Sequence, residues 1–152
     1  MTTSYKTVFE RFLGSIDDPM LLRLDDNSLL EFVRDWLHAA ASNPRFRHKF
    51  KTFSMDDEIM TITYDLNFPV DDEADEGFVV GVLSLGMVIR WMEPKVKSAK
   101  QLSIAVGEGK EKVLVNNYKQ SVQELAAMKS ELKQLISDYG YLHNSYISRG
   151  ET

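Results

Sequence analysis

The stretch Gly77-Phe-Val-Val-Gly-Val-Leu-Ser-Leu-Gly-Met-Val-Ile89 contains no charged side chain and is followed by Arg90-Trp-Met-Glu-Pro94. The uncharged run is shorter than the roughly 20 apolar residues that a membrane-spanning helix needs, so we expect no membrane span. Methionine, leucine and the proline at position 94 favour a helix over residues 77–93 that ends at the proline. Because this helix would be apolar nearly all round, we expect it at the centre of the fold, covered by protein on most sides.

Small residues share one face of this predicted helix. Gly77, Gly81 and Ser84 are spaced four and three residues apart, and Gly86 lies on a neighbouring face. Each glycine costs a helix about 1 kcal/mol relative to alanine, so the pattern predicts that the backbone of another helix approaches closely there. On this interpretation Gly81→Leu would cost several kcal/mol or abolish folding, because the added side chain would enter a close helix contact.

Three further segments have the spacing of amphipathic helices, at residues 5–16, 25–40 and 118–139. The acidic run at residues 71–76 lies where the dipole of the central helix favours negative charge. We predict a mainly α fold, a bundle of about four helices around the buried central helix, with a short β-strand or hairpin element. Residues 1–139 are expected to form a single domain and residues 140–152 a C-terminal tail.

Strict alternation of apolar and polar residues predicts one strand with one face in water. The apolar residues of this strand are Met60, Ile62, Tyr64, Leu66 and Phe68. A lone strand leaves its backbone donors and acceptors unpaired, and only residues 112–115, within an expected loop or hairpin at 101–117, look like a second strand. We therefore expect this strand to pair with another subunit.

The C-terminal tail carries large apolar side chains after a helix-ending glycine. They are Tyr141, Leu142, Tyr146 and Ile147. Because the predicted helices already supply a core, this apolar cluster predicts a surface that binds a partner. The alternative is that the last helix continues through Gly140 and these residues cap the bundle.

The composition narrows the possible chemistry. The chain has no cysteine, which excludes disulfides, thiolate metal sites and a cysteine nucleophile. A net charge of −5 argues against broad affinity for nucleic acid. Residues 43–51 are basic and aromatic, as in binders of single-stranded nucleic acid, but basic side chains at a helix end are the commoner reason for such a stretch.

Motifs for cofactors and metals are incomplete. Residues 106–111 lack the first glycine and the hydroxyl of a phosphate loop, and the carboxylates at 71–76 lack the glycine and glutamate of a calcium loop. The three histidines are too scattered to predict a metal site. We expect no cofactor, no metal and no catalytic residues, with a small hydrolase using Asp56, Asp57 or the 71–76 carboxylates as the enzymatic alternative.

Several motifs, taken in order, resemble one protein family. Leu85-Gly-Met-Val-Ile-Arg-Trp-Met-Glu-Pro-Lys-Val96 is similar to the central helix of small head–tail connector (neck or adaptor) proteins of tailed bacteriophages. Upstream, Asp56-Asp-Glu-Ile59 and Tyr64-Asp-Leu66 resemble the acidic turn and short strand of that family. Asn117, followed by a long amphipathic helix, resembles its end. The resemblance covers residues 5–139 and is carried by the order of the motifs.

The resemblance implies a non-enzymatic structural subunit of the virion neck. Such subunits form a homo-oligomeric ring, usually dodecameric, that docks on the portal protein and contacts other neck or tail proteins. The viral DNA passes through the channel of the ring without sequence-specific binding. The protein would be made in the host cytoplasm and located in the virion, at the head–tail interface. The alternative is a small helical interaction or assembly-factor module that works as a dimer outside the virion.

Overall fold

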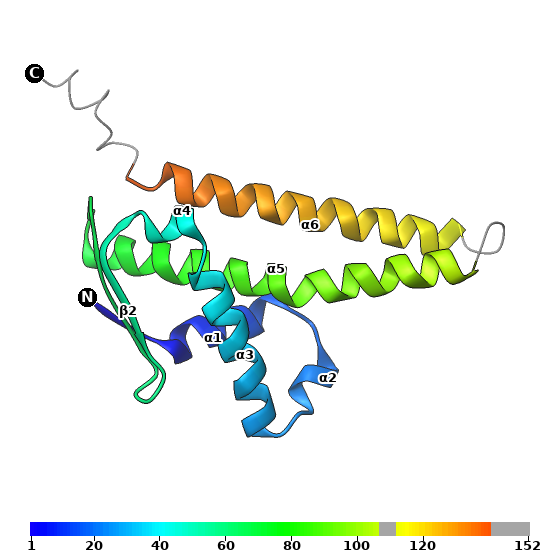
Figure 1. The fold of residues 1–152 in the computed structure, drawn as a ribbon, viewed down its shortest axis with the longest axis horizontal. Helices are drawn as coiled ribbons and strands as arrows, with labels where there is room; N and C mark the ends of the chain where they lie inside the picture. The colour runs from blue at the N-terminus through cyan, green and yellow to red at the C-terminus, as the bar shows by residue number, and fades with distance from the viewer. Residues whose placement is uncertain (107–111, 141–152) are drawn as a thin grey trace, which may run out of the picture.

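The fold combines helices with one small sheet (Figure 1). The computed structural model describes residues 1–106 and 112–140, which contain six helices and three strands. They are β1 (Thr2–Ser4), α1 (Tyr5–Ser15), α2 (Pro19–Leu22), α3 (Asp26–Ala41), α4 (Pro44–Arg47), β2 (Phe50–Asp56), β3 (Thr61–Leu66), α5 (Asp72–Val106) and α6 (Lys112–Asp138). The predicted mainly helical class with a short β element is confirmed. The predicted tail contacts, Tyr141, Leu142, Tyr146 and Ile147, lie outside the described residues.

Helix α5 is the longest element, with 35 residues and a length of about 50 Å. In Figure 1 it runs through the middle of the molecule, with α6 along one side and α1 and α3 on the other. Its residues Val79, Leu83 and Met87 are fully buried, as expected for a central helix. Tyr5 and Phe12 of α1 are fully buried in the same hydrophobic core.

The prediction that the central helix ends at Pro94 is wrong, because α5 continues through this proline to Val106. A proline inside a helix removes one backbone hydrogen bond and crowds the carbonyl four residues earlier, here that of Arg90. Both residues are exposed, so the proline lies on the surface of α5 and not in the core. The predicted loop or hairpin at residues 101–117 is also wrong, since residues 101–106 and 112–117 are helical.

The sheet is antiparallel with the strand order β1-β3-β2, so β3 is the central strand. Thr3 pairs with Ile62 on one side of β3, and Phe53 pairs with Tyr64 on the other. The predicted pairing of this strand with another subunit is therefore wrong, because both of its edges are occupied within the chain. Ile62, Tyr64 and Leu66 are buried in the core, whereas Met60 lies in the β2–β3 turn with φ 54°. Phe68 lies beyond the strand and is exposed.

The close helix packing predicted for Gly77, Gly81, Ser84 and Gly86 occurs at Gly86 but not at Gly77 or Gly81. A Cβ atom built on Gly86 would lie 2.7 Å from the Cβ of Ala40, so the absence of a side chain allows α3 to cross α5 at this point. At Gly77 and Gly81 an added Cβ would have no neighbour within 4 Å. Helical spacing therefore identified the small residues of this helix but not which of them lie against a neighbouring helix.

Part of α5 is long and apolar enough, by length and composition alone, to cross a membrane. Its most apolar window lies in Asp72–Ser98 and has a mean hydropathy of 1.3, but 56% of that window is buried within the fold. The core helix of a soluble protein passes the same test, so this feature is weak evidence for a membrane. The absence of a membrane span stays a prediction.

A glycine with a close neighbour and a glycine in open space should respond differently to substitution by alanine. Gly86→Ala is expected to destabilise the fold by about 1–3 kcal/mol, because the new methyl group must displace Ala40 in the α3–α5 contact. Gly81→Ala is expected to stabilise it by about 0.5–1 kcal/mol, because alanine is the better helix former and its Cβ enters open space. Urea unfolding of the two variants measures the difference. A Gly86→Ala protein as stable as Gly81→Ala would contradict the assigned helix contact.

Candidate functional site

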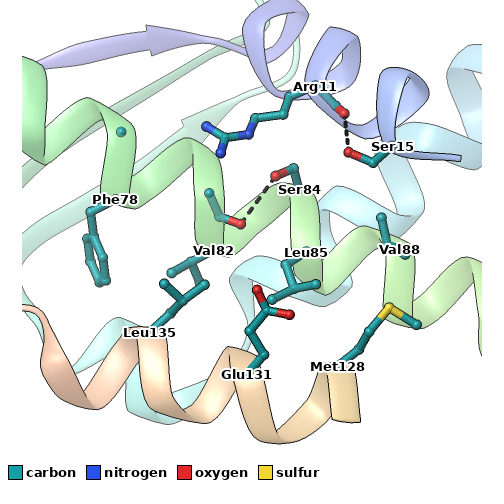
Figure 2. A pocket seen from close by; sticks show the side chains of 12 residues that line it. Arg11, Ser15, Phe78, Val82, Ser84, Leu85, Val88, Met128, Glu131 and Leu135 are labelled. Carbon is teal, nitrogen blue, oxygen red and sulfur yellow. Dashed lines mark hydrogen bonds between the residues drawn. The ribbon is translucent and has the colours of Figure 1, made fainter. Parts of the chain in front are cut away.

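A groove runs along α5 between α1 and α6, and we call it the α5–α6 groove. It consists of two joined cavities of about 440 and 340 Å³, which share Ser15, Val88 and Met128. Its floor is one face of α5, formed by Gly77, Gly81, Leu85, Val88, Met92 and Val96. Figure 2 shows the end of α1 on one side of the floor, and Met128, Glu131 and Leu135 of α6 on the other.

The small residues of α5 create the deeper part of this groove. Gly77 and Gly81 place no side chain between the two walls, and the side chain of Ser84 is buried. The hydroxyl of Ser84 donates a hydrogen bond to the carbonyl of Gly81 at 3.2 Å, so its polar group is satisfied within the helix (Figure 2). The residues predicted as a close-packing face, Gly77, Gly81 and Ser84, therefore lie together in an open groove, whereas Gly86 lies apart in the α3 contact.

The groove has charged residues on opposite rims. Arg11 extends from α1, and Glu131 extends from α6 on the other side (Figure 2). The hydroxyl of Ser15 donates to the carbonyl of Arg11 at 2.7 Å, within the last turn of α1. An apolar floor with charges at its edges is the usual composition of a surface that receives an amphipathic helix or an apolar loop.

The far end of the groove is fixed by Asp18, the N-cap of α2. The indole nitrogen of Trp91 donates to Asp18 at 2.8 Å, and the ammonium of Lys95 lies 3.4 Å from the same oxygen. The bond from Trp91, followed by the backbone amide of Leu21 and by Lys95, holds the pKa of Asp18 below its ordinary value. The start of α2 is thereby tethered to α5.

A second tether joins the start of α5 to the end of α6. The hydroxyl of Tyr139 and the backbone amide of Val70 both donate to the buried carboxylate of Asp75. The ring of Tyr139 stacks on Phe78, with the ring centroids 4.1 Å apart. Burial and the bond to Asp75 raise the pKa of Tyr139. These contacts hold the end of α6 against the start of α5 and so fix one wall of the groove.

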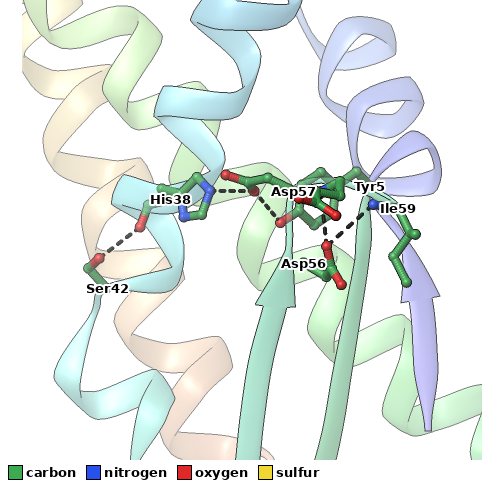
Figure 3. A network of polar contacts seen from close by, with 7 residues as sticks. Tyr5, His38, Ser42, Asp56, Asp57 and Ile59 are labelled. Carbon is green, nitrogen blue, oxygen red and sulfur yellow. Dashed lines mark hydrogen bonds and ion pairs between the residues drawn. The ribbon is translucent and has the colours of Figure 1, made fainter.

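A polar network ties the β2–β3 turn to the helices (Figure 3). Tyr5 donates to Asp57 at 2.6 Å, and a ring nitrogen of His38 lies 2.8 Å from the same carboxylate oxygen. The bonds with Tyr5 and then His38 lower the pKa of Asp57, while burial and Asp57 raise the pKa of Tyr5. Asp56 accepts from the backbone amides of Glu58 and Ile59, at 2.9 and 3.3 Å, and closes the turn.

The carboxylates considered for a hydrolase have structural partners. Asp56 and Asp57 hold the β2–β3 turn. In the 71–76 run, Asp71 accepts from the amide of Ala74 at 2.7 Å, and Asp75 is held by Tyr139. Within residues 1–106 and 112–140, no three side chains of histidine, aspartate or glutamate are grouped so that they could hold a metal ion.

Sequence reasoning missed an exposed apolar corner on the amino-terminal side of α3. Phe32, an apolar residue of the predicted amphipathic helix at 25–40, is 48% exposed, and Met20 of α2 is 77% exposed. The available signal was Met20-Leu-Leu-Arg-Leu24, an apolar stretch between the acidic pairs Asp17-Asp18 and Asp25-Asp26.

Comparison of the chain with protein-family models, with curated proteins and with solved structures gave no match.

The polar network predicts a pH-dependent contribution to stability. The lowered pKa of Asp57 means that its ionised form is stabilised by folding, so this contribution is present above the unfolded pKa of about 3.9 and is lost as the pH falls through the folded pKa. Because Asp57 is nearly half exposed, we expect Asp57→Asn to cost about 1 kcal/mol or less at pH 7. The difference from the parent should shrink below about pH 4.

Urea unfolding at pH 7 and pH 3 measures this effect, with Asp35→Asn on the exposed side of α3 as the matched control. A cost of Asp57→Asn that stays the same at both pH values would show that the charge of Asp57 does not hold the turn.

Proposed function

We propose that the chain is a structural subunit of a bacteriophage virion neck. In this proposal it is a ring-forming head–tail adaptor that docks on the portal protein, contacts other neck or tail proteins and continues the DNA channel. The observation that carries the proposal is the α5–α6 groove, an open apolar surface along a long pair of helices, which is suited to association with protein. The proposal includes a bundle in which α1, α3 and α6 surround α5.

The shape of the chain supports a role in assembly. In Figure 1 the α5–α6 pair extends well beyond the part covered by α1, α3 and the sheet. The exposed Val122 lies on α6, and Met92 and Val96 line the groove on α5. An antiparallel helix pair with an apolar side gains stability when neighbouring subunits cover that side.

The residues behind the family resemblance also have clear structural roles. Gly86 admits α3, Met87 is fully buried and Trp91 donates to Asp18. Residues that fix the packing of a central helix are those that related folds would share. In this proposal, a connector would use these residues for the same packing of its central helix.

The charge of the chain fits a conduit for DNA. With a net charge of −5, a ring of such subunits has no general attraction for phosphates, so DNA can pass without being held. The specific interactions of the ring would then be with protein on either side. The alternative, a dimeric interaction or assembly-factor module outside the virion, would use the same groove to pair two copies.

Binding to portal protein tests the proposed function. We expect that the purified chain, mixed with portal rings from the same phage, adds a second ring of density in negative-stain images. A chain that forms only dimers and leaves the portal rings unchanged would contradict the proposal and support the alternative module.

The C-terminal tail provides a separable prediction. A chain truncated after Tyr139 is expected to melt at nearly the same temperature as the full chain and to lose binding to portal or neighbouring rings. The physical reason is that the tail's large apolar residues would contact a partner rather than the core. A truncated chain that melts far lower, or that still binds portal, would remove the tail from the proposed interface.

A further inference from the structure

The corner between α2 and α3 carries four exposed large apolar side chains. We call it the α2–α3 corner, and it consists of Met20, Leu22, Leu24 and Phe32, which are 77%, 64%, 36% and 48% exposed. Helix α2 has only four residues, and Leu21 occupies its buried side. Met20 and Leu22 therefore project outward. A protein surface seldom exposes neighbouring large apolar residues unless something covers them.

The corner is not covered within the chain, since Met20 and Leu22 remain largely exposed. Asp18, directly before α2, is bonded to Trp91 and paired with Lys95, so α2 is tethered beside α5. The groove lies between α1 and α6, with Arg11 and Ser15 of α1 along its rim. Trp91 and Lys95 line the far end of the groove, so the tether fixes α2 next to the groove while the exposed side chains of the corner stay uncovered.

Both surfaces are apolar and carry charged residues at their edges. The groove floor runs from Gly77 to Val96, about 28 Å along a helix, and the corner is a short helical turn with projecting side chains. Arg23 lies between Leu22 and Leu24, and acidic residues 25 and 26 follow. The groove offers the opposite charges at its rims, with Glu131 on α6 and Arg11 on α1.

We propose that the α2–α3 corner of one copy of this chain docks in the α5–α6 groove of a second copy. Because a corner meets a groove, the contact is head-to-tail, and each copy offers a free corner and a free groove to the next. Such a contact closes into a ring when the rotation between copies divides a full turn. The inference rests on the proposed function for the closure into a ring, while the contact itself requires only this chain.

Single cysteines test the contact directly, because the parent chain contains none. Leu22→Cys on the corner is mixed with Leu85→Cys in the groove, one variant carrying a mass tag, and the mixture is oxidised alone and on portal rings. Since the two cysteines are on different chains, any disulfide between them reports a contact between copies. The matched control pairs Leu22→Cys with Val70→Cys, which is also exposed but lies in the β3–α5 loop.

We expect the corner–groove disulfide to form at least about 10-fold more than the control, because docking raises the effective concentration of the two thiols. A yield equal to that of the control, both alone and on portal, would overturn the proposal. Covalent ladders from the Leu22→Cys, Leu85→Cys double variant are expected for a head-to-tail contact. A product that stops at the dimer would overturn the head-to-tail arrangement.

Gly81→Leu provides a test without cysteine. The side chain would enter open space, so the variant should fold, but it would fill the groove and lower self-association measured by analytical ultracentrifugation. A folded Gly81→Leu protein that associates as well as the parent would contradict the docking site. If the disulfide forms but portal does not bind, the contact holds and the proposed function fails. If portal binds but the disulfide does not form, the proposed function holds and the proposed contact fails.

Discussion

The burial of α5 is the constraint on which the rest of the structure depends. An uncharged helical stretch from Gly77 to Ile89 must be shielded from water, and the chain does this with three different partners. Helix α3 crosses at Gly86, where no side chain stands between the backbones, α1 covers another side and α6 lies alongside. The side of α5 between α1 and α6 is left open as the α5–α6 groove. Its existence follows from how the other sides are filled.

Two polar tethers determine the width and direction of that groove. Asp75 joins the start of α5 to Tyr139 at the end of α6, and Asp18 joins the start of α2 to Trp91. Each carboxylate has more than one partner, which offsets the cost of removing a charge from water. The apolar contacts supply most of the stability, while these directional bonds select one arrangement of the helices. A groove with fixed walls is a better binding surface than one whose walls can move, because less order must be imposed on binding.

The sequence predicts an element well where its apolar residues recur with a regular period. It predicts poorly where a strand pairs with a segment far away along the chain. Apolar spacing gave the four long helices, though not the short α2 and α4, and the buried face of Ile62, Tyr64 and Leu66, because burial follows the period of the element. It missed β1, whose residues Thr2–Ser4 are polar and too few to show alternation, and so it assigned the partner of β3 to another subunit. The predicted end of α5 at Pro94 was wrong because the rule that a proline ends a helix considers only neighbouring residues. In the structure α6 packs along α5 on both sides of Pro94. The small-residue face was found from spacing, but spacing does not say whether a neighbour lies against it.

The short strand β1 has a consequence for the order of folding. β2 and β3 are neighbours in sequence and can form their hairpin soon after both are synthesised, whereas β1 pairs with β3 across most of the amino-terminal half. Until Thr3 returns to lie beside Ile62, the hairpin presents an unpaired edge, which is the usual template for misassembly between chains. The outward residues of β3 are Thr61, Thr63 and Asp65, so its exposed face is polar before β1 pairs with the strand. Helix α1 follows β1 directly, and its docking against α5 therefore carries the strand into place and closes the sheet.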